Sequence, residues 1–328
     1  MVKELIKSLL GEKNTARVRR LKSSLSAARA AWYSSGAPAA DITRDSLNVR
    51  QLISVHMLEK ALAVSNMKYL SAVKYPELIS NIARLLDMGL PPDDYTVAVS
   101  AAIIRSALAT LPGHEDEKSQ LGALVSRHNI PAQDYRGGAE VVPSAEILSH
   151  ANFDFNAFVS SRHSVRKFRD KVIPGPVIRE IVRDALYCPS ACNRQPFRVY
   201  YSEDRGKIAE IIKLGADGFV APGVHDCLIV TCDRALFSPA ELDDQEYVNG
   251  GIFLGYLVMS IHAHGLGSCL FQCLRSGFAK QALIRHVFGI SESEVIVCCV
   301  GIGELEDEVN VACAQRRLTE TVAVSLDS

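Results

Sequence analysis

The sequence predicts a helical N-terminal region followed by a sandwich of helices and strands, in the α+β or α/β class. Before residue 150, apolar side chains recur three and four positions apart, the spacing of amphipathic helices. After residue 150, apolar runs of strand length alternate with helical segments, as in helices packed on a sheet. With 328 residues, 48% of them hydrophobic, the chain can bury one large core or two ordinary ones. We therefore expect a helical region over residues 1–150, able to act as a lid or bind a partner, and a sandwich over residues 151–328.

Three helices are predicted in the first region, over residues 49–67, 75–88 and 95–111. Proline and glycine separate them, because Pro76, the run Gly89-Leu-Pro-Pro92 and the pair Pro112-Gly113 all break helices. Residues 119–144 are polar and rich in turn-forming residues. They are predicted to be a linker or an irregular excursion.

The second region begins with a helix that Pro174-Gly-Pro176 introduces and that ends near Cys188, because proline is tolerated in a first turn. The remaining predicted elements are strands over residues 197–201, 227–232 and 295–300 and helices over residues 245–264 and 279–288. The helix over residues 245–264 is apolar nearly all round from residue 252 to 261, which is typical of a helix in a core or an oligomer interface.

Composition excludes several classes of function. The net charge of −1 gives no global field that would attract nucleic acid or acidic lipid. All nine cysteines lie from Cys188 onward and no pair has the CxxC spacing, so we expect buried, reduced thiols and no metal.

The N-terminus resembles neither a secretion signal nor a membrane span, and we expect a cytoplasmic protein. The first thirty residues are locally basic, which fits either a solvated helix face or an anionic membrane surface.

Two short clusters about thirty residues apart carry the chemistry. In residues 161–168, Arg162, Ser164 and Arg166 share one face of an extended segment, because side chains alternate there, and this face suits a phosphate. In residues 189–197, Ser190, Asn193 and Gln195 lie between prolines, as in a loop that holds the heteroatom edge of a planar heterocycle. Together the clusters predict a site for a mononucleotide cofactor.

Other interpretations of these residues remain open. The arginines could be surface cations, and Cys192 could simply pack. Alternation turns His163 away from the phosphate face, which favours a structural role. His56, Glu59 and Lys60 fit one solvated helix face.

The region from about residue 153 onward resembles the nitroreductase family of flavin enzymes. The resemblance rests on four motifs in order: Arg-His-Ser-x-Arg-x-Phe from Arg162, Pro-Ser-x-x-Asn-x-Gln-Pro-Phe from Pro189, Gly265-Leu-Gly-Ser-Cys269, and Gln315-Arg-Arg-Leu318. It implies an α+β sandwich with a mostly antiparallel central sheet flanked by helices, and an intertwined homodimer with FMN at its interface. The motif His56-x-x-Glu59-Lys60 is similar to one in a branch with an N-terminal helical extension, which is often linked to polysaccharide biosynthesis.

The resemblance assigns the phosphate half of the FMN site to charged and polar residues. These are Arg162, Ser164 and Arg166, with His163 in the same segment and Arg316 and Arg317 from the C-terminal segment. Arg166 is also the candidate for stabilising the anionic reduced flavin.

The flavin ring, by the same resemblance, would be lined from the partner subunit by Pro189, Ser190 and Asn193, with Gln195 supporting their loop. Leu270, Phe271 and Gln272 would run past the ring, where family members offer backbone N–H groups to flavin N5. Gln272, Cys273 and Gln315 stand where better-known members have glutamate, glycine and lysine.

The function that the resemblance implies is an FMN-dependent oxidoreductase. NADH or NADPH would pass hydride to flavin N5, and a small electrophilic acceptor would then be reduced in the same pocket by ping-pong turnover. The alternative is a flavin-binding or scaffold protein without turnover in polysaccharide biosynthesis. The substitution at Cys273 favours it, as does the short segment before the helix over residues 245–264, where many members insert a lid.

Overall fold

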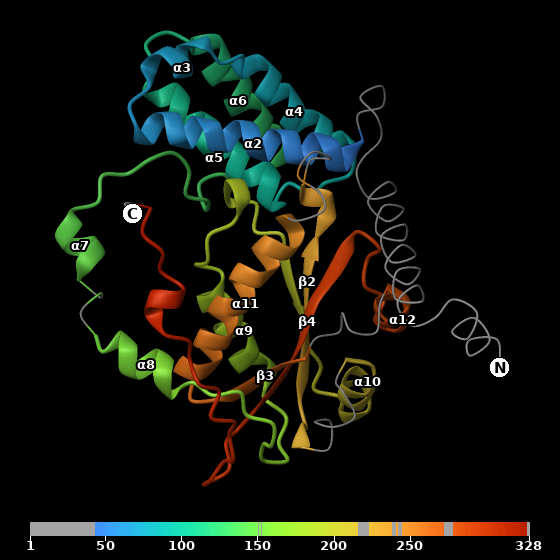
Figure 1. Cartoon of the computed structure of the whole chain (residues 1–328). Helices are drawn as coiled ribbons and strands as arrows, with labels where there is room; N and C mark the ends of the chain where they lie inside the picture. The colour runs from blue at the N-terminus through green and yellow to red at the C-terminus, as the bar shows by residue number, and fades with distance from the viewer. Residues whose placement is uncertain are drawn as a thin grey trace, which may run out of the picture.

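The structure is a computed structural model that describes residues 43–149, 151, 153–215, 223–237, 241, 245–271 and 278–326. Its helical region forms one end of the molecule and a four-stranded sheet with helices on both faces forms the rest (Figure 1). The basic run in the first thirty residues lies outside the described residues.

The helical region consists of α2 (Arg44–Ala63), α3 (Met67–Ala72), α4 (Tyr75–Asp87), α5 (Tyr95–Ala109) and α6 (Glu115–His128). These helices enclose a hydrophobic core of their own. Helix α5 lies deepest, because its run of small and branched apolar residues leaves most of its side chains buried. The Asp94 side chain caps its first turn by accepting a hydrogen bond from the Thr96 N–H at 2.9 Å.

The sheet consists of β1 (Phe197–Tyr200), β2 (Cys227–Asp233), β3 (Gly267–Phe271) and β4 (Glu294–Gly303), in the order β1-β2-β4-β3. Each of the three strand pairs is antiparallel. Strands β2 and β4 are buried on both faces, which explains their continuous apolar sequence. The predicted α+β class with a mostly antiparallel sheet is confirmed.

Helices cover both faces of the sheet (Figure 1). On one face, α9 (Gly175–Ala185) and α11 (Gln245–Ala263) pack on β2 and β4 through residues such as Ile178, Phe253 and Leu228. On the other face lie α10 (Arg205–Gly215) and α12 (Phe278–Phe288). The shorter elements are α7 (Ser144–Leu148), α8 (Phe155–Ser161) and the 3-10 turns η1 (Ala191–Asn193), η3 (Arg234–Leu236) and η5 (Thr319–Thr321).

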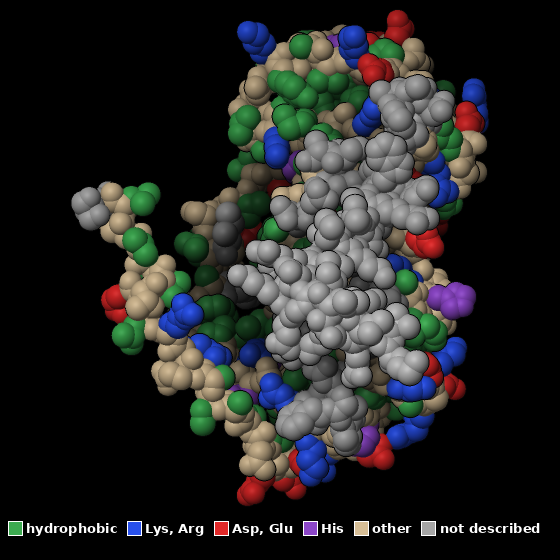
Figure 2. Space-filling model, turned by 45° about the vertical axis from the view of Figure 1, so that its right-hand side comes forward, with side chains coloured by type: hydrophobic (Ala, Val, Ile, Leu, Met, Phe, Trp, Pro, Cys, Tyr) green, Lys and Arg blue, Asp and Glu red, His purple; other side chains and the backbone are tan. Residues whose placement is uncertain are grey.

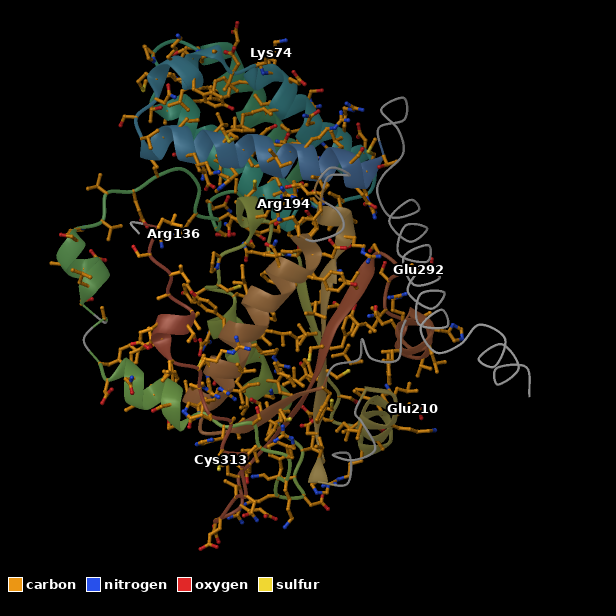
Figure 3. The ribbon with its side chains drawn as sticks, in the orientation of Figure 1. Lys74, Arg136, Arg194, Glu210, Glu292 and Cys313 are labelled. Atoms are coloured by element: carbon orange, nitrogen blue, oxygen red, sulfur yellow. The ribbon has the colours of Figure 1, made fainter. Side chains whose placement is uncertain are left out.

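The helical region and the sandwich meet at η1 and η3, which both contact α2. Leu236, at the end of η3, packs against the core of the helical region. Arg194, which follows η1, lies between the helical region and the sheet (Figure 3). The junction is therefore formed by the segment that precedes β1 and the segment that follows β2.

One prediction about elements is wrong, and two other elements differ from what the sequence indicates. The predicted linker over residues 119–144 is helical as far as His128, because Leu121 and Leu124 face the core from an otherwise polar helix. Residues 267–271, for which no element was predicted, form strand β3. The first predicted helix is present, but it begins five residues earlier, at Arg44, and ends at Ala63.

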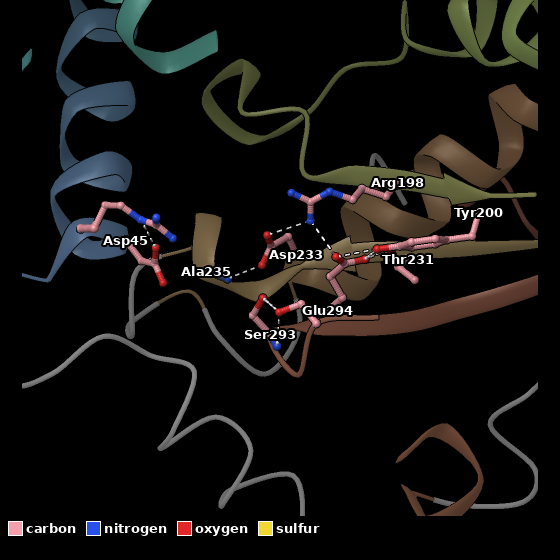
Figure 4. Close-up of polar contacts among 10 residues, drawn as sticks. Asp45, Arg198, Tyr200, Thr231, Asp233, Ala235, Ser293 and Glu294 are labelled. Carbon is pink, nitrogen blue, oxygen red and sulfur yellow. Dashed lines mark hydrogen bonds and ion pairs between the residues drawn. The ribbon is translucent and has the colours of Figure 1, made fainter. Parts of the chain in front are cut away.

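A buried carboxylate, Glu294, joins three strands near the end of the sheet (Figure 4). It accepts hydrogen bonds from Arg198 at 2.8 Å, from the Tyr200 hydroxyl at 2.9 Å and from the Thr231 hydroxyl. Burial, and then Glu294 itself, raises the pKa of Tyr200 to about 12. Since each polar atom of Glu294 has a partner, this cluster stabilises the sheet and offers no open site.

The surface carries charges of both signs, mixed over the face that Figure 2 shows, as expected for a net charge of −1. Among the described helices, none has both the length and the apolar character needed to span a membrane.

Candidate functional site

The first cluster lies where helix α8 ends and an extended segment begins. The backbone becomes extended at Arg162, with φ −72° and ψ 122°. Three residues later the Val165 N–H donates to the Ser268 carbonyl at 3.0 Å, and Ser164 forms a parallel bridge with Ser268. The cluster thus runs along the outer edge of strand β3.

Phe168 anchors the end of this segment in the core. Its side chain is only 2% exposed. A Cβ atom at Gly303 would lie 2.7 Å from the Phe168 Cβ, and one at Gly267 would lie 3.0 Å from the Phe168 ring. A side chain at Gly303 would therefore clash with Phe168, and one at Gly267 would press against its ring. The Phe168 N–H also donates to the Gly223 carbonyl at 3.0 Å.

The first cluster and the C-terminal segment line one pocket of about 550 Å³. Its walls consist of Val159, Ser160, Arg162, His163, Ser164, Arg166, Ala312, Cys313, Ala314, Gln315 and Arg316. The first and fourth sequence motifs, 149 positions apart at Arg166 and Gln315, thus meet in space. His163 lines the pocket as well, because the segment is not a regular strand and strict alternation does not hold. Arg317 is exposed and is not among the lining residues.

Three guanidinium groups give this pocket its electrostatic character. In the part of the chain that the structure describes, Arg162, Arg166 and Arg316 form no ion pair with a carboxylate. Arg166 donates to the Ser164 carbonyl at 3.1 Å, and Arg316 donates to the Ala314 carbonyl. Arginine forks without a carboxylate partner are suited to bind a phosphate by charge-assisted hydrogen bonds.

The field of these arginines extends to the neighbouring strand. Cys269 on β3 is buried, and burial raises the pKa of its thiol. Arg166 and Arg162 act in the opposite direction, because positive charge favours a thiolate. The pocket is therefore a positively charged one.

The second cluster forms a tightly wound loop around η1. Three of its residues that are not glycine have left-handed backbone conformations, namely Cys192 and Asn193 with φ 50° and Gln195 with φ 48°. Each such residue costs on the order of 1–2 kcal/mol, so the surrounding contacts must hold the loop in place. Within the loop, the Ser190 hydroxyl accepts a hydrogen bond from the Gln195 N–H at 3.0 Å.

Arg194 anchors the loop to the segment that follows strand β2. Its side chain is buried and pairs with Glu241 through two hydrogen bonds, of 2.6 and 3.0 Å. It also donates to the Leu236 carbonyl at 2.8 Å, and its guanidinium lies 5.3 Å from the centre of the Phe237 ring. From helix α11, the Asn249 side chain accepts a hydrogen bond from the Ala191 N–H at 2.8 Å.

Tyr95 contacts the loop from the helical region, and sequence reasoning did not find it. Its hydroxyl lies 2.9 Å from Gln195 Nε2 and 3.3 Å from Asn193 Nδ2. A tyrosine at the start of a helix carries no signal of a partner one hundred residues away. The nearby motif of α2 places His56 Nδ1 3.1 Å from Glu59 Oε2, and Lys60 is exposed.

The pocket and the loop lie at opposite ends of the sandwich in one chain. Figure 3 labels Cys313, which lines the pocket, and Arg194, which belongs to the loop, and the two are far apart in that view. Separation in a projection can only underestimate the true distance. One chain therefore does not bring the two clusters together around a single small molecule.

The third motif lies partly outside the described residues. Leu270 is 44% exposed and Phe271 is buried at the end of β3, whereas Gln272 and Cys273 are not described. The prediction that the cysteines are buried holds for most of those described and is wrong for Cys313, which is exposed at the pocket.

Comparison with known proteins gives the same assignment as the motifs. Residues 159–222 match the model of the nitroreductase family. The chain is 26% identical over 178 residues to an NADH dehydrogenase of Thermus thermophilus, covering 45% of this chain and 84% of that protein. It is 25% identical over 206 residues to a 4-nitrobenzoate reductase of Pseudomonas putida, covering 48% of this chain and 88% of that protein.

Solved structures are also similar to this one. An FMN-dependent nitroreductase from Clostridium difficile R20291 is 20% identical, with a TM-score of 0.42, and the match covers 49% of this chain and 92% of that one. The family model and the two sequence relatives show that this part of the chain is similar to the nitroreductase family.

Proposed function

We propose that the protein is an FMN-dependent oxidoreductase that takes hydride from NADH or NADPH and reduces a small electrophilic acceptor. The observation that carries this proposal is the pocket in which Arg162, Arg166 and Arg316 have no carboxylate partner among the described residues. Its volume of about 550 Å³ lies in the range typical of cofactor sites. The relatives from Thermus thermophilus and Pseudomonas putida, named for NADH oxidation and nitro-group reduction, support the same reaction class.

Bound FMN would supply the electron transfer, and the residues of this chain would bind and orient it. Arg162, Ser164 and Arg316 would hold the phosphate. Arg166 would place positive charge near the reduced cofactor. Proton transfer in this scheme is left to solvent.

The same protein is proposed to be a homodimer in which each FMN contacts both chains. The two clusters lie at opposite ends of one chain, so one FMN can contact both only if a second copy supplies the loop. Helix α11 exposes Val248, Ile252 and Tyr256, spaced four residues apart on one face. Gly251 and Gly255 lie on the same face with open space around them, which allows another helix to approach closely.

Ile252→Asp tests the dimer. A charge buried in an apolar helix interface is costly, so we expect the variant to be monomeric by light scattering and to lose FMN. Leu283→Asp is the matched control, since Leu283 is an exposed leucine on α12, on the other face of the sheet. A dimeric Ile252→Asp variant, or a wild-type monomer that retains FMN, would rule out the shared site.

The flavin proposal has a direct test by colour. The purified protein is expected to bind FMN, turn yellow, and lose its visible absorption when NADH or NADPH is added without oxygen. A protein that takes up no FMN contradicts the proposal. A yellow protein that neither nucleotide bleaches would instead support a flavin-binding protein without turnover.

A further inference from the structure

We propose that Tyr95 is a positioning residue, by which the helical region fixes the two side-chain amides of the loop so that they present oxygen atoms to the flavin ring edge. The proposal rests on the function proposed above. It gives the helical region a part in cofactor recognition. Four features of the structure support it: the hydrogen bonds of Tyr95, its rigid setting, the strain of the loop, and the orientation of the amides.

The Tyr95 hydroxyl uses all of its hydrogen-bonding capacity on this loop. It accepts from Gln195 Nε2 at 2.9 Å and from Asn193 Nδ2 at 3.3 Å, and it donates to the Asn193 carbonyl at 3.3 Å. A tyrosine hydroxyl has one proton and two lone pairs. Tyr95 therefore binds backbone and side chains of the loop at once.

Tyr95 is itself held rigidly. It is the first residue of α5, directly after the Asp94 cap, and α5 is the most deeply buried helix of the helical region. Its ring packs at 6.4 Å from the ring of Tyr135. Burial raises the pKa of its hydroxyl, so the proton that it donates is retained at neutral pH. The loop is thus attached to a fixed point.

The strained loop requires a fixed contact on the side that faces the helical region. Asn193 and Gln195 have left-handed backbones, and both flank Arg194, whose buried side chain is directed to Glu241. The contacts of Arg194 and Asn249 hold the loop through the sandwich. Tyr95 holds it through Asn193, which the resemblance places at the flavin ring, and through Gln195, which the resemblance assigns to the support of the loop.

The hydrogen bonds of Tyr95 also select which amide atoms remain available. Gln195 Nε2 has one hydrogen directed to Tyr95 and lies 3.5 Å from the Asn193 carbonyl, so its nitrogen is engaged. Among the described residues, neither Asn193 Oδ1 nor Gln195 Oε1 has a hydrogen-bond partner. Both amides therefore offer acceptors, which complement an N–H donor such as the imide N–H of a flavin ring.

Tyr95→Phe removes the hydroxyl and keeps the ring. We expect FMN to bind about tenfold more weakly, because the loss of one hydrogen-bonding group lets both amides rotate. The absorption band of bound flavin is expected to shift. Tyr135→Phe is the matched control: its ring also packs beside Tyr95, but its hydroxyl donates to the Asp93 carbonyl at 3.1 Å and not to the loop. That variant is expected to match the wild type in affinity and spectrum.

A second variant tests whether Tyr95 acts through Gln195. Gln195→Met removes the amide, and Tyr95→Phe should then have a smaller effect on FMN affinity than in the wild-type background. Equal effects in both backgrounds would contradict the orientation argument. Unchanged affinity and spectrum in a folded Tyr95→Phe protein would overturn the proposal.

Amide hydrogen exchange separates this proposal from the proposed function. The N–H groups of Asn193 and Arg194, which donate to Ser190 and Ala191 carbonyls, should exchange faster in Tyr95→Phe than in Tyr135→Phe, with or without flavin. If the wild type binds no FMN, the proposed function fails, and so does the orientation of the amides towards a flavin. If FMN binds and exchange is the same in both variants, only the role of Tyr95 fails.

Discussion

Replacing Arg162 and Arg316 together by alanine is expected to weaken FMN binding by roughly 10² to 10⁴. Each charge-assisted hydrogen bond to a phosphate contributes about 1.5–3 kcal/mol, and each 1.4 kcal/mol changes affinity tenfold. The two side chains come from distant parts of the chain and face the same pocket. The structure shows no carboxylate, among the described residues, whose charge would be left unpaired by their removal.

Riboflavin provides the decisive comparison, since it has the ring and ribityl chain but no phosphate. The double variant should lose most of the preference for FMN over riboflavin, measured by quenching of flavin fluorescence. Arg179→Ala is the control, because that arginine lies on α9 and donates to the Tyr201 hydroxyl at 2.8 Å, outside the pocket. A double variant that still prefers FMN as strongly as the wild type would refute the phosphate assignment.

Phe168→Ala is expected to lower the free energy of unfolding by about 3–5 kcal/mol, the usual cost of removing a buried aromatic side chain. The ring lies against Gly267 and Gly303 and is almost completely buried. Phe168→Leu keeps most of the volume and should cost less than about 1.5 kcal/mol. Urea unfolding of the wild type and the two variants measures both values, provided that the unfolding free energy depends on urea concentration with the same slope in all three.

The same variant connects stability to binding. Because Phe168 ends the segment that carries Arg162 and Arg166, its loss should also weaken FMN binding in the fraction that remains folded. Phe168→Leu should bind FMN nearly as the wild type does. If Phe168→Ala unfolds no more easily than Phe168→Leu, the ring is not the anchor of the segment.

The periodicity of apolar residues predicted those helices and strands that bury most of one face or both faces. The helical period is visible in residues 75–88 and 95–111, because the buried side of a helix requires apolar side chains at regular spacing. The apolar runs of β2 and β4 are visible because both faces of these strands are buried. Helix α6 was not predicted, since only two of its side chains are buried and the rest is polar. Strand β3 was not predicted because its five residues begin with a glycine.

The candidate site was predictable only in part, for a different physical reason. Arg162, Ser164 and Arg166 carry a pattern within one short segment, and the resemblance supplied Arg316. The contact of Tyr95 with Gln195 joins residues one hundred positions apart and depends on how the helical region packs on η1 and η3. No local rule gives such a contact. Cys313 likewise lines the pocket from an irregular segment, whose path no sequence periodicity predicts.

The packing of Leu236 against the helical region bears on the order in which the chain can fold during synthesis. The helices from α2 to α6 leave the ribosome first, yet a side chain that packs on their core follows β1 and β2. The contact of Leu236 with their core can therefore form only after β2 has been made. A nascent chain that stops before η3 would lack this contact, and the apolar side chains beneath it would stay open to chaperones and to other chains.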